Sequence, residues 1–469
     1  MSEVRVTSRP AVTRTPPVSG LASSAARFAC GVARDGVPPD VVASAKANLL
    51  YDLVCAMGAV GAVERAGPAW SLARGTAPAT ATLLGDGERV HVEQAAFANG
   101  VLMHARAQDD THYPSQTHPG AVVIPAALAV SERFEASGAR FLAAVIAGYE
   151  VAATVGEELS DLVIARGFRA ASLFGVLGAA TAGAVAAGLD EARTAHAIAL
   201  AASFASGLAQ TWTDGAEEWT YQLGVAARSG VTATLLAQAG LRAAERALEG
   251  ANGFAAAFSG GELTLAWPRD PGGRWRIIEV IHKLYPACNI VQAPVAAVIE
   301  LVARHDLAVS DVRSVRCALN PDDWAYPGTL GAAPFAGTGG PLMSVPFCIA
   351  VAIVRRGLPL DALDAGCGSS EELADLAGRI EVEPDGALAR LDARVEIATA
   401  GGDVFSRQWR GDAASYAWSW PEIVSWASAL GRELSDGHRL AIERVIEAVW
   451  RIDDAPGVSP LAAATVISP

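Results

Sequence analysis

Residues 108–120, QDDTHYPSQTHPG, bring together side chains that can transfer protons. The stretch contains two carboxylates, two imidazoles, a phenol and three hydroxyl groups. Histidine titrates near neutral pH, so His118 is a candidate general base or acid, and Asp109 or Asp110 can orient its imidazole. The alternative interpretation is structural, because these side chains also cap helices and form hydrogen bonds within loops.

A second stretch, HKLYPACNIVQA at 282–293, contains one of only two lysines in the chain, Lys46 and Lys283. The remaining 34 of the 36 basic residues are arginines. A lysine that persists against such a bias is a candidate for a role that requires a small, titratable ammonium group.

The composition excludes several classes of protein. Hydrophobic residues make up 51% of the 469 residues and charged residues 18%, which is typical of a globular protein of two or three domains. The net charge of −14, without a basic stripe, argues against nucleic-acid binding. The six cysteines show neither metal-like spacing nor a disulfide framework, which indicates a cytoplasmic protein. The apolar run 171–189 is rich in Ala and Gly, so we expect a buried helix and no membrane span.

The spacing of apolar residues predicts a mainly α protein, with a large all-helical domain and a smaller α+β domain inserted into it. We expect residues 1–17 to be a disordered tail. Residues 18–266 and 412–455 are expected to form the helical domain, and residues 267–411 the inserted domain, which begins at the Pro/Gly-rich linker 267–275.

Alternating apolar and polar residues predict the strands of the inserted domain at 312–319, 379–383 and 393–399. Gly401 and Gly402 can turn the last of these into a hairpin with 403–409. Ser344 is predicted to cap a helix that ends at Gly357.

The chain resembles the MmgE/PrpD family over nearly its whole length. The resemblance rests on residues 99–132, which include DDT and HPG, on AGYEV at 147–151, and on the K-x-YP-x-C pattern that begins at Lys283. It implies a helical domain with an inserted α+β lid, a homodimer, and a site between the domains that uses no cofactor. It also implies removal of a proton next to a carboxylate, as in the dehydratases, decarboxylases and epimerases of the family.

Carried over residue by residue, the resemblance implies the catalytic residues His118, Asp109, Lys283 and Tyr285. His118 would be the general base or acid, and Lys283 would stabilise an enolate or donate a proton. Tyr285 would donate a hydrogen bond or a proton. The alternatives are a helix-start hydrogen bond for His118 and an ion pair for Lys283. The expected substrate contacts are Gln108, Asp110, Thr111, His112, Arg169, Trp219, Tyr221, Gln222 and Gln292.

Several positions depart from the family pattern. Ala107 replaces the first Asp of D-F-D-D-T, and Arg169 stands at the His of Gly-Phe-His. Trp219 and Gln222 replace the Lys and His of K-x-L-H-x-G, and Gln292 stands where a His commonly follows K-x-YP-x-C. These changes weaken the binding of a di- or tricarboxylate and add aromatic area. Arg169 retains one positive donor.

The sequence therefore predicts a cofactor-independent lyase that acts through an enolate on a larger, weakly anionic intermediate of specialised metabolism. Dehydration, Michael-type addition and ring closure are all compatible with such a site. One alternative is a dehydratase, decarboxylase or epimerase of a small polycarboxylate, and another is a non-catalytic binding protein. We expect no metal, because His104, Asp109, Asp110 and His112 match no standard ligand spacing.

Overall fold

The computed structural model describes residues 20–60, 63–261, 273–335, 337–364, 367–411 and 413–468. The expected tail at 1–17 and residues 267–272 of the expected linker lie outside these ranges.

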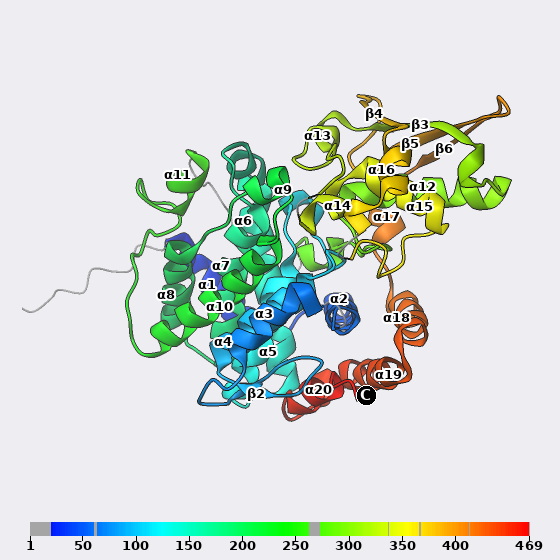
Figure 1. Cartoon of the computed structure of the whole chain (residues 1–469). Coiled ribbons are helices and arrows are strands. Elements are labelled where there is room, and N and C mark those ends of the chain that lie inside the picture. Colours follow the sequence, from blue (N-terminus) through cyan, green and yellow to red (C-terminus); the bar gives the residue numbers. More distant parts are fainter. Residues whose placement is uncertain are drawn as a thin grey trace, which may run out of the picture.

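Helices from both ends of the chain share one hydrophobic core (Figure 1). The helices before residue 262 are α1 (Leu21–Asp35), α2 (Pro39–Gly58), α3 (Val63–Ala73), α4 (Val92–His104), α5 (Pro119–Arg133), α6 (Gly138–Ala165), α7 (Ala170–Ala186), α8 (Glu191–Phe204), α9 (Gln210–Asp214), α10 (Trp219–Gln238) and α11 (Phe254–Ser259). Of these, α9 is the exception, because its Trp212 belongs to the second core described below. Those near the C-terminus are α18 (Trp420–Leu434), α19 (Asp436–Trp450) and α20 (Ser459–Ala464). The fold is thus mainly α, as predicted.

Small residues let these helices approach closely. A Cβ atom on Gly178 of α7 would lie 2.6 Å from the carbonyl oxygen of Gly148 of α6, and one on Gly148 would lie 2.8 Å from that of Gly178. Such separations are too short for a real Cβ atom, so the contact between α6 and α7 requires both glycines. Helix α7 is buried along its whole length, as expected for the run 171–189. Helices α2 and α6 are long and apolar enough to span a membrane, but most of each is buried within the protein.

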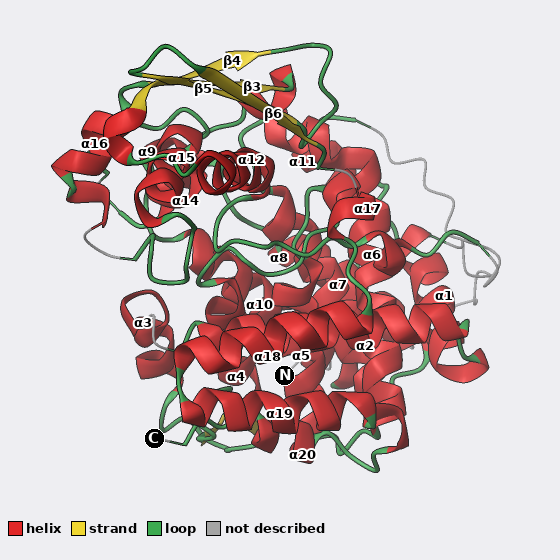
Figure 2. Ribbon diagram, turned by 90° about the vertical axis from the view of Figure 1, so that its right-hand side faces the viewer, coloured by secondary structure: helices red, strands yellow, loops and turns green. Residues whose placement is uncertain are grey.

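A second hydrophobic core surrounds a four-stranded sheet. The strands are β3 (Val312–Leu319), β4 (Ile380–Pro384), β5 (Ala393–Thr399) and β6 (Val404–Trp409), in the order β4-β3-β5-β6. The β3–β4 pair is parallel and the other two pairs are antiparallel. Helices α12 (Asn289–His305) and α15 (Val345–Arg355) pack on one face of this sheet (Figure 2). The shorter helices of this region are α13 (Pro321–Trp324), α14 (Gly339–Met343), α16 (Glu371–Ala377) and α17 (Ala413–Tyr416).

Most of the predicted local features are present. Strands β3 and β5 have the predicted bounds, and the side chain of Ser344 accepts a hydrogen bond from the Phe347 amide at the start of α15. The predicted end of that helix was wrong by one residue, because Arg356 and not Gly357 adopts the left-handed conformation, with a φ of 52°.

The helical region is not entirely helical. A short antiparallel pair, β1 (Ala81–Thr82) and β2 (Arg89–Val90), interrupts it. Gly85 and Gly87 have φ values of 85° and 84°, and these left-handed residues allow the chain to reverse between the two strands. The sequence carried this signal in its Gly-Asp-Gly turn.

Candidate active site

The polar loop 108–120 connects α4 to α5 and is attached to a distant part of the chain. The amide of Thr111 donates to the carbonyl of Ile281 at 3.0 Å, and the amide of Ile281 donates back to Thr111 at 2.8 Å. A similar pair of bonds joins His112 and Thr117 within the loop. Pro119 occupies the first turn of α5, as expected. The loop therefore lies beside the segment that carries Lys283.

His104, at the end of α4, lies between a carboxylate and a guanidinium group. Its Nδ1 atom is 2.7 Å from Asp109 Oδ1, and its Nε2 atom is 2.7 Å from Arg169 Nη2. A guanidinium group can only donate hydrogen bonds, so Nε2 must accept and the proton must reside on Nδ1. Burial lowers the pKa of His104 to about 4 despite the neighbouring Asp109. His104 is therefore neutral near pH 7 and donates to Asp109.

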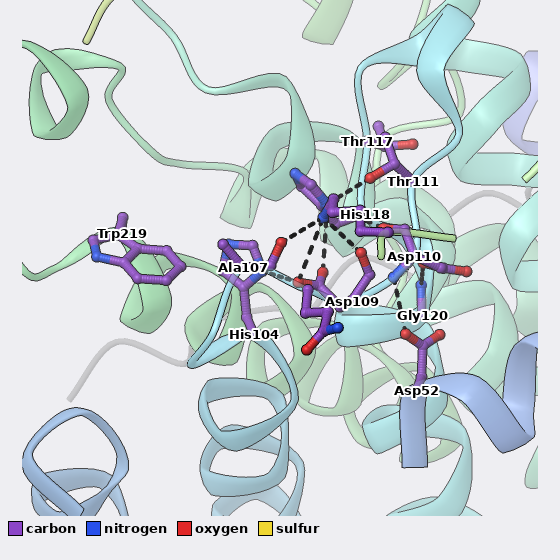
Figure 3. Close-up of polar contacts among 12 residues, drawn as sticks. Asp52, His104, Ala107, Asp109, Asp110, Thr111, Thr117, His118, Gly120 and Trp219 are labelled. Carbon is purple, nitrogen blue, oxygen red and sulfur yellow. Dashed lines mark hydrogen bonds and ion pairs between the residues drawn. The ribbon is translucent and has the colours of Figure 1, made fainter. Parts of the chain in front are cut away.

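His118 also lies next to Asp109 (Figure 3). Like His104, it carries its proton on Nδ1 and not on Nε2, as its neighbours show. Its Nδ1 atom lies 3.1 Å from the carbonyl oxygen of Asp110 and 3.2 Å from the hydroxyl oxygen of Thr111. A carbonyl only accepts, so Nδ1 carries the proton and Nε2 does not. Burial, assisted by the charge of Lys283, holds the pKa of His118 well below its usual value. His118 is therefore a neutral base near pH 7.

Asp109 is ionised even though it is fully buried. Burial alone would raise its pKa, but the hydrogen bond from His104 and the charge of Lys283 outweigh that effect and the pKa lies well below its usual range. Its Oδ2 atom accepts no hydrogen bond from the described residues and lies 3.4 Å from His118 Nδ1. The carboxylate is thus placed to stabilise an imidazolium at His118 after proton uptake.

Lys283 holds the start of the loop in place. Its buried ammonium group donates to the carbonyls of Ala107 at 2.7 Å and Asp109 at 2.6 Å, and lies 4.0 Å from Asp109 Oδ1. Ala107 has a φ of 54°, a left-handed conformation that is strained for a residue other than glycine, and the bond from Lys283 helps to maintain it. The amide of Lys283 in turn donates to the Tyr51 hydroxyl at 2.9 Å.

Asp110 points away from His118, toward a second carboxyl group (Figure 3). It accepts hydrogen bonds from the Gly120 amide at 2.9 Å and the Tyr149 hydroxyl at 2.8 Å, while its own amide donates to Asp52 at 3.0 Å. Burial raises the pKa of Asp110 to about 7 and that of Asp52 well above its usual value. This pair anchors the loop to α2 and α6.

A cavity of about 80 Å³ lies between the two hydrophobic cores, next to the loop. One ordered water needs roughly 10–15 Å³, so the cavity holds several atoms of a small molecule. The first core and its loop supply His104, Ala107, Thr111, Tyr113, Gln116, His118, Arg169, Ala170 and Ala171 to its wall. The remaining wall consists of Trp212, Lys283, Cys288, Asn289, Ile290, Asp323, Tyr326, Met343 and Arg390.

Comparison with known proteins identifies the family. The sequence matches the MmgE/PrpD N-terminal domain over residues 23–266 and the MmgE/PrpD C-terminal domain over residues 285–451. The chain belongs to the MmgE/PrpD family.

Several curated proteins are similar to this MmgE/PrpD chain. The cis-aconitate decarboxylase of Aspergillus terreus is 28% identical over 369 residues, which are 72% of each chain. The cis-aconitate decarboxylase-like protein oryM of Aspergillus oryzae is 25% identical over 385 residues, 75% of this chain and 77% of that protein. The cis-aconitate decarboxylase of Mus musculus is 34% identical over 172 residues, 35% of this chain and 34% of that protein. The family and these relatives mark the chain as a divergent, lyase-like enzyme of the decarboxylase and dehydratase type.

Of the residues expected from the MmgE/PrpD resemblance, four line the cavity, namely Thr111, His118, Arg169 and Lys283. Asp109 lies directly behind His104 and His118. Arg169 already uses both terminal nitrogens, since Nη1 donates to the carbonyl of Trp219 and Nη2 to His104. Its guanidinium group stacks on the Trp212 ring at 4.9 Å.

The other expected contacts do not line the cavity. Tyr285 packs against the second core, and Gln292 fixes the Tyr285 turn through hydrogen bonds to its amide and carbonyl, both 3.0 Å. Gln108 donates to the Leu284 carbonyl at 3.2 Å. Trp219 is fully buried, and its ring lies edge-on to His104 at 4.9 Å.

Three more expected contacts also lie outside the cavity wall. Gln222 Oε1 accepts a hydrogen bond from Arg169 Nη1 at 3.5 Å. The centre of the Tyr221 ring lies 6.2 Å from that of the Phe97 ring. His112 is turned toward Glu157 and Glu279, at 3.8 and 3.9 Å.

The sequence did not indicate several polar groups of the cavity wall, including Gln116 and Asn289. The sequence suggests His104 only as a possible metal ligand, and it gives no sign of a role for Asp323, Tyr326 or Arg390. The last three come from loops and one short helix of the second core, where no motif marks them. Tyr326 remains a neutral phenol, because burial raises its pKa to about 12.

Two groups of side chains within the described residues have metal-ligand types at suitable separations, His104–Asp109–His118 and His112–Glu157–Glu279. In the first group, Arg169 and Lys283 already supply positive charge. In the second, two arginines form ion pairs with the carboxylates, Arg274 with both and Arg276 with Glu157. The chain's own cations thus neutralise the acidic residues of each group.

Proposed function

We propose that this MmgE/PrpD protein is a cofactor-independent lyase that forms an enolate next to a single carboxylate. His118 Nε2 takes the proton from the carbon beside the carboxylate, and the electron pair of that C–H bond forms the enolate. The enolate then expels a hydroxyl group as water, with a proton supplied by a cavity donor such as Tyr326. The observation that carries this proposal is the unprotonated Nε2 of a neutral His118 at the cavity wall, backed by ionised Asp109.

The cavity wall favours a weakly anionic substrate. Lys283 donates to two backbone carbonyls, and both terminal nitrogens of Arg169 donate to protein acceptors. Trp212, Ile290 and other apolar side chains make up much of the rest of the wall. Few cationic donors are therefore free, which suits one carboxylate better than two or three.

We also propose that the product can react further. The unsaturated acid formed by elimination is an electrophile, and a site that stabilises enolates can guide a Michael-type addition or a ring closure in specialised metabolism. The cavity of about 80 Å³ accommodates a small acid. A larger intermediate would require the two cores to move apart.

A second candidate is decarboxylation of a small polycarboxylate. It is favoured by the similarity to cis-aconitate decarboxylases and by the small cavity. In this reaction the C–C bond to the carboxylate breaks, carbon dioxide leaves, and the resulting carbanion takes a proton from a cavity donor.

Proton NMR in heavy water tests both candidates. Chelator-treated protein would be incubated with cis-aconitate, 2-methylcitrate, iminodisuccinate and a series of 3-hydroxy monocarboxylates. Deuterium uptake or loss of water from a monocarboxylate supports the first candidate, and turnover of cis-aconitate supports the second. His118→Ala should slow the reaction about 10²- to 10⁴-fold, whereas the exposed His305→Ala should not. Wild-type turnover by His118→Ala would refute the role of His118. Silence with every substrate, from a folded protein, would favour a substrate larger than those tested and would leave a non-catalytic binding role open.

The resemblance to the family further leads us to propose a homodimer. We propose a cytoplasmic location because all six cysteines are free thiols. Light scattering on the purified protein measures the oligomeric state. Fractionation of the source cells determines the location.

A further inference from the structure

Arg390 presents an unusually free guanidinium group to the cavity. Its side chain is 33% exposed, and its Nε donates to Asp323 Oδ1 over a long 3.4 Å. Apart from the neighbouring Tyr113 hydroxyl, no described residue accepts a hydrogen bond from Nη1 or Nη2. Those two nitrogens form the edge of the guanidinium group that binds a carboxylate through two parallel bonds.

The surroundings of Arg390 hold the group in position and leave most of its N–H donors unused. The Tyr113 ring lies under the guanidinium carbon at 5.1 Å, and the Tyr113 hydroxyl donates to Asp323 Oδ1 at 2.9 Å. The amide of Leu391 donates to Asp323 Oδ2 at 2.6 Å, which fixes the backbone next to Arg390. Asp323 is 1% exposed and already accepts these two bonds, so it depends little on Arg390.

The other cations of the cavity differ in this respect. Arg169 donates from both terminal nitrogens to protein acceptors, and the Lys283 ammonium donates to two carbonyls. Both are almost fully buried, at 4% and 1% exposure. Among the described cationic residues of the wall, Arg390 therefore has the most hydrogen-bonding capacity left for a ligand.

We propose that Arg390 is the residue that binds the substrate carboxylate, with Tyr113 beneath it as an aromatic support. This inference rests on the proposed function, since it names the partner of the carboxylate beside which His118 acts. It also moves the carboxylate from Arg169, the donor expected from the sequence, to a residue of the second core. The substrate would then touch both cores, His118 from one and Arg390 from the other.

Binding of a matched pair of small probes tests the proposal without requiring turnover. Crotonate and crotonamide have nearly the same shape, and only crotonate carries a charge. Ligand-observed NMR titrations would give the Kd of each for the wild type, Arg390→Gln, Arg390→Lys and Arg394→Gln. Arg394 is the matched control, because it forms an ion pair with Asp385 at 2.8 Å outside the cavity wall.

The wild type and Arg394→Gln should bind crotonate more tightly than crotonamide. Arg390→Gln should weaken crotonate binding at least about tenfold, as expected for loss of a bidentate charged contact, and leave crotonamide unchanged. Arg390→Lys should give an intermediate Kd. If Arg390→Gln does not fold, Arg390→Lys replaces it as the test variant.

An unchanged crotonate Kd in folded Arg390 variants would overturn the proposal, as would equal binding of the two probes by the wild type. A third result would separate the two proposals. If crotonate binds selectively and its binding depends on Arg390, but no substrate exchanges protons in heavy water, the proposed function is refuted and the carboxylate site is confirmed.

Discussion

The guanidinium of Arg169 and the imidazole of His104 lie 2.7 Å apart, and this contact determines where the protons of the site reside. Because Arg169 can only donate, His104 must present a lone pair at Nε2 and a proton at Nδ1. The Nδ1 proton is donated to Asp109 Oδ1. Asp109 Oδ2 therefore remains available to interact with His118. The guanidinium group of Arg169 thus determines the tautomer, and with it the role, of a neighbouring residue.

We therefore expect nitrogen-15 NMR to find His104 as the neutral Nδ1–H tautomer near pH 7. In Arg169→Met the Nε2 acceptor loses its donor, so the pKa of His104 should rise and the tautomer preference should weaken. Turnover should fall about 10- to 100-fold, since the Asp109 carboxylate is no longer held in place. An Nε2–H tautomer in the wild type would contradict this account.

Lys283→Met should strongly destabilise the protein. It leaves two buried carbonyls without a donor and the Asp109 carboxylate without its nearest ammonium group, a loss of about 3–5 kcal/mol in the free energy of unfolding. Urea denaturation measures the loss.

Lys46→Met is a natural control for this substitution, because Lys46 is the other lysine of the chain and pairs with Asp453 at the surface. It should cost about 1 kcal/mol or less. The double variant Lys283→Met/Asp109→Asn should recover part of the stability, because it removes the uncompensated charge. Strictly additive losses would show that the two groups do not interact.

Gly120→Ala should prevent normal folding of the loop. A Cβ atom at this position would overlap the Asp52 carboxylate and lie 2.7 Å from the Tyr149 hydroxyl oxygen. All of these atoms are buried, so we expect a loss of about 3 kcal/mol or more, or no soluble protein. Thermal unfolding measures the effect. Gly386→Ala, where a Cβ atom would meet nothing within 4 Å, should leave the Tm nearly unchanged.

The buried pair Asp52–Asp110 should give the protein a distinctive pH dependence. The pKa of Asp110 is raised to about 7 in the folded protein, against about 3.9 in an unfolded chain. The folded state therefore binds this proton more tightly. Its contribution to stability is fully present below about pH 4 and is lost as the pH rises through about 7.

Asp110→Asn remains uncharged throughout, so its stability relative to the wild type should increase between pH 4 and pH 7. The slope should approach about 1.4 kcal/mol per pH unit for one full proton. Chemical denaturation of both proteins at several pH values gives this difference in the free energy of unfolding. The histidines, whose lowered pKa values act in the opposite direction, contribute equally to both proteins, so their effect cancels in the difference. A constant difference would mean that Asp110 is ionised at every pH tested.

The sequence was a good guide to local structure. Strands β3 and β5 have the predicted bounds, and in β5 the alternating sequence pattern follows the burial of one face, whereas the end of β3 is buried on both faces. The site was predictable only where a motif marked it. His118 and Lys283 stand in such motifs and line the cavity, whereas Tyr285 stands in one and faces the second core.

Arg390 shows why the rest could not be predicted. The chain contains many arginines, and nothing in its immediate neighbours distinguishes this one. Its importance arises from what the other cations do, since Arg169 and Lys283 are occupied by acceptors that only the folded structure brings to them. Hydrogen-bond capacity that remains unused is a property of the whole site and not of a sequence motif.

The bond from Lys283 to the Asp109 carbonyl spans 174 residues of chain. During synthesis, the ribosome completes helices α1 to α11 before it reaches this lysine. Until Lys283 emerges, the nascent loop has a carboxylate and two carbonyls that cannot be buried without their donor. The hydrogen bonds that Lys283 makes to the loop can therefore form only after the whole of α1 to α11 has been synthesised. A polypeptide that terminates before residue 283 would lack Lys283 and also the C-terminal helices α18, α19 and α20, which belong to the first core.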